Sequence, residues 1–203
     1  MKKILILISM TVLSSTLMAQ QGSWYVGGLV GVSSSKSEDT GSGLETVNTS
    51  WALSPEFGTF LKDDIQLGIA LGFGGSKEKF DGDDVSKSSQ INPTVYGRKF
   101  FKVSDNFSVF AGLYLRIISE KTTTYGPTLE TTTSGFGARV GVGVAYALSP
   151  RFTAVGQYGL LGYSATKDKV DGNETSKDSS FDFGVNTTGA SVFNIGLYYT
   201  IKQ

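Results

Sequence analysis

The feature that most constrains the fold is a two-residue alternation of apolar with small or polar side chains, which recurs along the chain after residue 20. The segment 65–73, for example, reads Ile-Gln-Leu-Gly-Ile-Ala-Leu-Gly-Phe. Successive side chains of a β-strand point to opposite faces of its sheet, so this period is typical of strands with one apolar face. No segment after residue 20 sustains the 3.6-residue period of an amphipathic helix. The sequence therefore predicts an all-β protein.

Eight such segments can be delimited, and the connections between them are of two kinds. Three connections are short and rich in turn-forming residues, at 62–64, 104–106 and 149–151. The other four are long, polar and charged, and we expect them to be loops: 35–48, 78–88, 122–134 and 166–188. Because long and short connections alternate, an up-and-down meander places every short turn at one end, as in outer-membrane barrels. The predicted strands are about 22–34, 49–61, 65–77, 89–103, 107–121, 135–148, 152–165 and 189–202.

The composition of the two strand faces distinguishes a membrane barrel from a soluble one. In a soluble barrel the apolar face lines the interior and charged residues cover the outside. Here the second face is mainly glycine, alanine, serine and isolated charges, which suits a narrow lumen, and the uncharged face suits lipid. Unsatisfied backbone groups are costly in hydrocarbon, so such strands must close into a ring. We predict an eight-stranded antiparallel up-and-down transmembrane β-barrel, with a soluble periplasmic lipocalin-like ligand-binding barrel as the alternative.

The N-terminus has the layout of a secretory signal peptide. Lys2 and Lys3 precede an uncharged, mostly apolar segment at 4–18, and small Ala19 precedes Gln20. This apolar segment is shorter than the roughly 20 residues of a transmembrane helix. We therefore expect a signal peptide at 1–19, a barrel domain at 20–203, and delivery to the outer membrane of a Gram-negative cell.

Composition excludes several classes of function. The chain has no cysteine and no histidine, which removes disulfides, thiol nucleophiles, Ser-His-Asp triads and the usual zinc sites. Its 18 basic residues balance 18 acidic ones, so no nucleic-acid partner is implied. Asp-Gly-Asp-Asp at 81–84 is more typical of a turn than of a calcium site. We expect no cofactor, no metal and no catalytic residue.

Several motifs resemble the outer-membrane β-barrel domain family, whose small eight-stranded members have OmpA- and OmpX-like architecture. They are the strand–turn–strand unit at 53–69, the segments 92–107 and 160–164, and the closing segment 193–199. The resemblance covers essentially all of 20–203 and implies this barrel fold. It implies little about activity, because one architecture serves many roles.

Four charged residues fall on the predicted inward face of different strands: Glu56, Arg98, Arg116 and Arg139. A buried charge needs a partner, so we predict that Glu56 bonds to at least one of these arginines. Arg98 is the first choice because it and Glu56 lie equally far from their short turns. The predicted role is a lumen charge network that plugs a narrow barrel, and the alternative is a gate or ion path.

These observations favour a non-enzymatic surface protein with a plugged lumen, which serves adhesion or envelope integrity through its outer loops. A narrow pore for small solutes is the second hypothesis. We expect contact with outer-membrane lipid and lipopolysaccharide, and with the barrel-assembly machinery during biogenesis. We also expect a monomer whose extracellular ligand the sequence does not identify.

Overall fold

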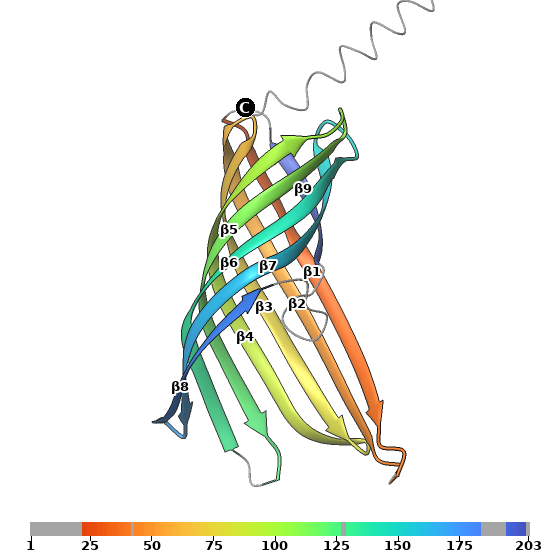
Figure 1. The fold of residues 1–203 in the computed structure, drawn as a ribbon, viewed down its shortest axis with the longest axis vertical. Helices are drawn as coiled ribbons and strands as arrows, with labels where there is room; N and C mark the ends of the chain where they lie inside the picture. Colours follow the sequence, from red (N-terminus) through yellow and green to blue (C-terminus); the bar gives the residue numbers. More distant parts are fainter. Residues whose placement is uncertain (1–21, 42, 127–128, 184–193, 202–203) are drawn as a thin grey trace, which may run out of the picture.

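The computed structural model describes residues 22–41, 43–126, 129–183 and 194–201, which form one antiparallel β-barrel (Figure 1). The described residues contain no helix long and apolar enough to cross a bilayer. The predicted signal peptide, 1–19, lies outside the described residues. The strands are β1 (Trp24–Glu38), β2 (Glu45–Lys62), β3 (Ile65–Phe80), β4 (Asp83–Lys102), β5 (Phe107–Thr124), β6 (Leu129–Ala147), β7 (Phe152–Val170), β8 (Asn173–Phe183) and β9 (Asn194–Ile201).

The ring has eight positions, and β8 and β9 share the last of them. Strands β1 to β7 each pair with the next, and β9 pairs with both β7 and β1 to close the ring. β8 pairs with the C-terminal half of β7, where Phe183 lies opposite Leu161, whereas β9 pairs with its N-terminal half, where Asn194 lies opposite Gln157. Beyond Val30, the described part of β1 pairs with β2 alone. The predicted closing strand 189–202 is thus described only from Asn194.

The prediction of four long loops was wrong, because most of those residues continue the strands. The observed connections are short, at 39–44, 81–82, 125–128 and 171–172, and β8 falls within the expected loop 166–188. Asp81 and Gly82 have φ angles of 49° and 88°, and Asp171 and Gly172 have 48° and 85°. Positive φ at both central residues is the type I′ turn, which matches the twist of paired strands. The polar composition thus reflects strands with water on both faces.

Charge pairs across the hairpins support these extensions. Three of the pairs join neighbouring strands on opposite sides of a turn: Lys36–Glu45 at 2.6 Å, Lys77–Asp84 at 2.7 Å and Lys121–Glu130 at 2.9 Å. Opposite charges on adjacent strands favour one register over its alternatives. We call this end of the barrel the long-hairpin end, and the end with connections 63–64, 103–106 and 148–151 the short-turn end.

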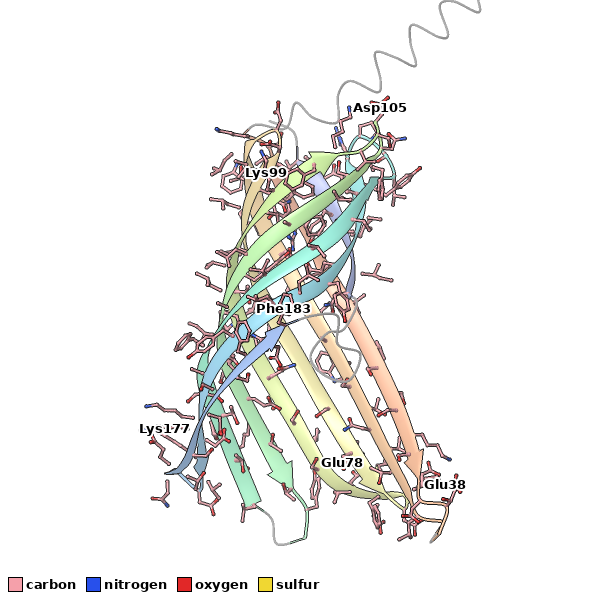
Figure 2. The ribbon with its side chains drawn as sticks, viewed as in Figure 1. Glu38, Glu78, Lys99, Asp105, Lys177 and Phe183 are labelled. Carbon is pink, nitrogen blue, oxygen red and sulfur yellow. The ribbon has the colours of Figure 1, made fainter. Side chains whose placement is uncertain are left out.

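The exterior is an apolar belt, as expected for a strand face in contact with lipid. Its aliphatic side chains point away from the barrel and are about half exposed, among them Val26, Leu53, Ile69, Val95, Leu113 and Leu197. In Figure 2 the labelled charged residues lie at the two ends, with Lys99 and Asp105 at the short-turn end and Glu38, Glu78 and Lys177 at the long-hairpin end. Aromatic pairs mark the short-turn rim, where Trp24 stacks on Phe57 with ring centroids 5.1 Å apart. This exterior overturns the lipocalin-like alternative.

The interior is filled by large polar and aromatic side chains placed over small ones. The buried group comprises Tyr25, Tyr96, Phe110, Tyr114 and Tyr198 together with Glu56, Gln66, Arg98 and Gln157. Gly58 and Gly68 lie beneath the Tyr25 hydroxyl, where a Cβ atom at either position would collide with it. The small residues of the inward face therefore create the room for the large ones, and an eight-stranded barrel has little room to spare.

Candidate functional site

A layer of hydrogen-bonded side chains around Arg98 crosses the lumen in its short-turn half. Arg98 on β4 and Glu56 on β2 are 2% and 4% exposed, and Arg98 Nη2 lies 3.0 Å from Glu56 Oε2. Tyr198 on β9 donates to the same carboxylate oxygen at 2.7 Å and accepts from Arg98 Nη1 at 2.9 Å. The ring is complete at this level, because Gly27 of β1 lies opposite Glu56 on one side and Tyr198 on the other. Side chains from three strands, β2, β4 and β9, thereby meet across the lumen.

The remaining donors of Arg98 bind neutral side chains from three further positions in the ring. Its Nε donates to the Tyr114 hydroxyl at 2.9 Å, Nη1 to Gln66 Oε1 at 3.2 Å and Nη2 to Gln157 Oε1 at 3.3 Å. Tyr114 in turn donates to Gln157 at 3.0 Å. Among the described residues, no buried side-chain nitrogen or oxygen lacks a hydrogen-bond partner. Such full satisfaction is what makes a buried polar layer rigid rather than costly.

Aromatic rings pack around the guanidinium group of Arg98. Its Cζ lies 4.1 Å from the Tyr96 ring centroid, a distance typical of cation–π attraction. Tyr96 also shares a 2.6 Å hydrogen bond with Tyr25, which is fully buried. On the short-turn side, Phe110 packs against Phe100 at a tilted angle of 43°, with ring centroids 5.2 Å apart. We call Glu56, Gln66, Arg98, Tyr114, Gln157 and Tyr198, with the Tyr25–Tyr96 pair, the Arg98 layer.

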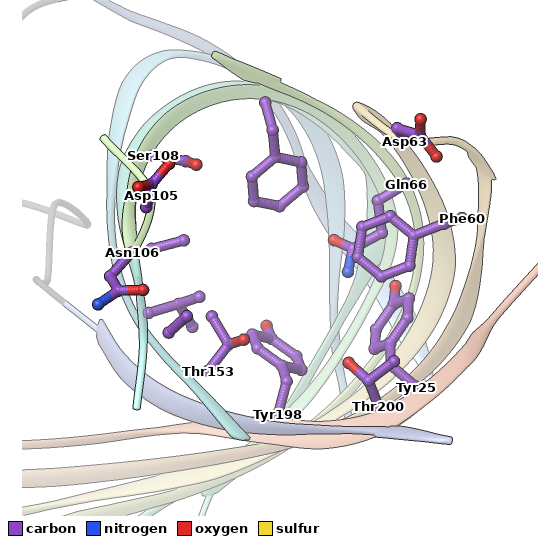
Figure 3. A pocket seen from close by; sticks show the side chains of 14 residues that line it. Tyr25, Phe60, Asp63, Gln66, Asp105, Asn106, Ser108, Thr153, Tyr198 and Thr200 are labelled. Atoms are coloured by element: carbon purple, nitrogen blue, oxygen red, sulfur yellow. The ribbon is translucent and has the colours of Figure 1, made fainter. Parts of the chain in front are cut away.

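Two cavities lie on opposite sides of this layer and share no lining residue. The first, of about 70 Å³, opens at the short-turn end and is drawn in Figure 3, where Gln66 and Tyr198 of the layer lie with Asp63, Asp105 and Asn106 of the turns. The second, of about 190 Å³, lies toward the long-hairpin end above Glu56, Tyr96 and Tyr114. Arg98 lines neither cavity, because it lies between them.

The structure divides the four predicted lumen charges into two groups. It brings Glu56 and Arg98 into contact, as the equal spacing from their turns suggested. Arg116 on β5 and Arg139 on β6 instead line the second cavity, and neither makes an ion pair within the described part of the chain. The single network of four charges expected from the sequence is therefore a pair plus two separate arginines.

The neutral members of the Arg98 layer escaped sequence reasoning. Gln66 lies directly opposite Arg98 in the strand register, and Tyr96 lies opposite Tyr114. Their shared signal is a large polar side chain on a face that otherwise carries small residues. Gln157 and Tyr198 belong to β7 and β9, so the sequence alone does not give their level relative to Arg98.

The architecture agrees with the comparison to known proteins. The family model described as outer membrane protein beta-barrel domain matches residues 5–200, which is nearly the whole chain. The chain belongs to this family. Membership supports the outer-membrane location and explains the lipid-facing belt.

Several solved outer-membrane barrels have the same fold as this chain at low sequence identity. OprG of Pseudomonas aeruginosa is 15% identical with a TM-score of 0.52, and the match covers 92% of this chain and 99% of that one. Neisserial surface protein A is 15% identical with a TM-score of 0.54 and coverages of 88% and 97%. The translocator domain of NalP from Neisseria meningitidis is 8% identical with a TM-score of 0.50 and coverages of 98% and 95%. No curated protein sequence matches the chain. At these identities the likeness concerns the fold alone.

Proposed function

We propose that this outer-membrane barrel is a non-enzymatic surface protein with a plugged lumen, and that its four polar hairpins make the functional contacts outside the membrane. Adhesion and envelope integrity are the two roles that suit such a protein. The single observation that carries the proposal is the Arg98 layer, whose buried ion pair and hydrogen bonds separate the two lumen cavities.

The shape of the hairpins supports a role in surface contacts. The β3–β4 and β7–β8 hairpins end in two-residue turns, and their strands continue past the apolar belt with polar side chains on both faces. A paired ribbon loses less conformational freedom on binding than a loop of equal length, so it presents its side chains at a lower entropic cost. In this proposal the barrel acts as a monomer that contacts lipid and lipopolysaccharide, after assembly by the barrel-assembly machinery.

The absence of an enzymatic role is part of the proposal. With no histidine and no cysteine in the sequence, the inward face offers hydroxyl, amide, carboxylate and guanidinium groups only. The buried carboxylate, Glu56, is already held by Arg98 and Tyr198. A carboxylate engaged in this way is a poor nucleophile or base, which favours a structural role for the layer.

Conductance measurements in planar lipid bilayers test whether the Arg98 layer closes the lumen. The purified protein is expected to show no sustained channel, whereas Glu56→Ala/Arg98→Ala, which removes the ion pair, is expected to join the two cavities and conduct. Heat-modifiable gel mobility verifies that the double variant still forms a barrel. Steady open channels in the wild-type protein would overturn the proposed plug, whether or not the variant folds.

The surface role needs a separate experiment on cells. Cells that lack the protein are compared with cells that carry a variant whose hairpins are shortened to the edge of the apolar belt. We expect the shortened barrel to insert normally yet fail to restore attachment to surfaces or resistance to detergent. Full restoration by the shortened variant would show that the hairpins are not the functional part.

A narrow pore is the second candidate, favoured by the cavities themselves. Both reach toward the Arg98 layer from opposite ends of the lumen, so a rearrangement of this one layer would join them. The conductance comparison distinguishes the two candidates, because a gated pore would show transient openings in the wild-type protein.

A further inference from the structure

The cavity on the long-hairpin side of the Arg98 layer carries an excess of positive charge. Arg116 and Arg139 line it from neighbouring strands, at inward positions of β5 and β6. We propose that this cavity is an oxyanion site that binds a phosphate group entering from the outside of the cell. The site lies beyond the Arg98 layer, so it does not depend on whether that layer closes the lumen.

Neither of the two arginines that line the cavity is engaged in an ion pair within the part of the chain that the structure describes, so both can bind a ligand. Among the described residues that line it, the one carboxylate is Glu56, which already binds Arg98 at 3.0 Å and Tyr198 at 2.7 Å. Neither Arg116 nor Arg139 lies within 4.0 Å of a carboxylate oxygen in the described residues. The stretch 184–193, outside the described residues, contains no acidic residue in its sequence. Arg139 is half-buried and Arg116 is exposed to water, so an anionic ligand can bind both guanidinium groups without first breaking an ion pair.

The backbone beneath the two arginines is shaped to hold them. Arg116 lies over Gly137, where an added Cβ would come within 3.0 Å of its Nε, and Arg139 lies over Gly159, where a Cβ would come within 3.0 Å of its Cδ. Arg139 also packs against Tyr114, with Cζ 5.0 Å from the ring centroid. Side chains larger than glycine at these two positions would displace the arginine stems from the wall.

The remaining lining of the cavity is mixed, with apolar residues such as Leu29 and Phe73 beside polar ones, several of which lie on β4. Gln90, Asn92 and Thr94 on β4 contribute amide and hydroxyl groups, and Asn92 already donates to Gln90 at 3.0 Å. Guanidinium groups match the geometry of phosphate oxygens and bind them through charge-assisted hydrogen bonds. The volume of about 190 Å³ is large enough for one such group with water.

The competing explanation is neutralisation by acidic residues farther out. Asp182 on β8 lies level with Arg139 but two strands away, across Gly162. At about 4.8 Å per strand, that separation is roughly 10 Å between backbones. Asp182 is exposed, so water screens its attraction for Arg139. Asp182→Asn should therefore leave phosphate binding unchanged or slightly tighter.

Equilibrium dialysis of radiolabelled inorganic phosphate against the full-length barrel in maltoside detergent tests the proposal at constant ionic strength. We expect one saturable site per barrel. Arg116→Gln and Arg139→Gln should each weaken it at least tenfold, about 1.4 kcal/mol, and the double variant should abolish it. Arg151→Gln is the matched control, because Arg151 lies in the 148–151 turn at the other end of the barrel and bonds to Tyr199. Heat-modifiable mobility verifies folding of every variant.

Absence of saturable binding to the wild-type protein, or binding that survives in the double variant, would overturn the site. Two sources of phosphate share this chemistry, a soluble phosphate compound and the headgroup of an outer-leaflet lipid. Repeating the dialysis in phosphatidylcholine vesicles with and without phosphatidic acid separates them. Competition by phosphatidic acid identifies the lipid headgroup, and unchanged binding identifies the soluble source.

Discussion

Replacing Glu56 with glutamine tests whether the ion pair, and not shape alone, holds the lumen together. The Glu56 and Arg98 side chains are 2% and 1% exposed, so the variant leaves a buried guanidinium with neutral partners only. Removing one member of a buried pair costs about 3–5 kcal/mol. We expect Glu56→Gln to lower the free energy of unfolding by about 3 kcal/mol, the lower limit of this range, because Arg98 keeps neutral acceptors such as Gln66 and Tyr114. Arg98→Met should approach about 5 kcal/mol, because it leaves the buried Glu56 carboxylate without its cation and with Tyr198 as donor, and it removes the Arg98 donor from Gln66.

The double variant Glu56→Gln/Arg98→Met completes the cycle. Because each single variant already breaks the same ion pair, we expect the double to cost about 2 kcal/mol less than the sum of the two. Urea unfolding in vesicles, followed by Trp24 and Trp51 fluorescence and by gel mobility, measures these free energies. Asp84→Asn, which removes an exposed pair with Lys77, is the control and should cause no measurable change. Additive single variants, or a Glu56→Gln effect below about 1 kcal/mol, would refute the reasoning.

Three further predictions concern the interior, the short-turn rim and a hairpin turn. Gly68→Ala should destabilise the barrel by about 1–3 kcal/mol in the same unfolding assay, because the new methyl group displaces the buried tyrosine pair above it; Gly162→Ala meets open space and should be neutral. A hydrogen bond from Lys99 lowers the pKa of Asp64, so this contact stabilises the barrel at neutral pH and is lost as pH falls through that lowered value. NMR titration should find the Asp64 pKa below its usual range and, in Lys99→Met, back within it; an unchanged value would contradict the pairing. Gly82→Val strains the β3–β4 turn at φ 88°, and faster amide exchange confined to that hairpin should follow. Exchange equal to that of wild type would contradict the assigned turn.

The fold could be predicted from the sequence because lipid imposes a strict alternation on each strand. Every residue in the segment 65–73 obeys it, and the observed strand β3 begins at Ile65 as expected. The ends of the hairpins were not predictable by the same rule, because water covers both faces there and removes the apolar signal. Asp81-Gly82 and Asp171-Gly172 nevertheless carried the turn information. In such barrels an Asp-Gly pair within a polar stretch therefore indicates a hairpin tip rather than a loop.

Pairing in the lumen was predictable only where the register was local. Glu56 on β2 and Arg98 on β4 lie on either side of β3, about equally far from their own short turns, so their contact followed from counting residues. Arg116 and Arg139 were grouped with them because the alternation gives the face of a side chain but not its depth. Depth depends on strand tilt and on the shear of the closed ring, which are collective properties of all eight positions.

The proposed closure of the lumen and the proposed phosphate site lie at different depths of the barrel. The Arg98 layer lies where β9 completes the ring, and its charges balance as one carboxylate and one guanidinium. Toward the long-hairpin end, β1 passes beyond its pairing with β9, and the two further arginines face a wider, solvent-accessible space. We propose that the neutral Arg98 layer closes the lumen and that the cationic cavity next to it binds an anion. Variants of Glu56 should therefore alter conductance and stability, whereas variants of Arg116 and Arg139 should alter phosphate binding alone.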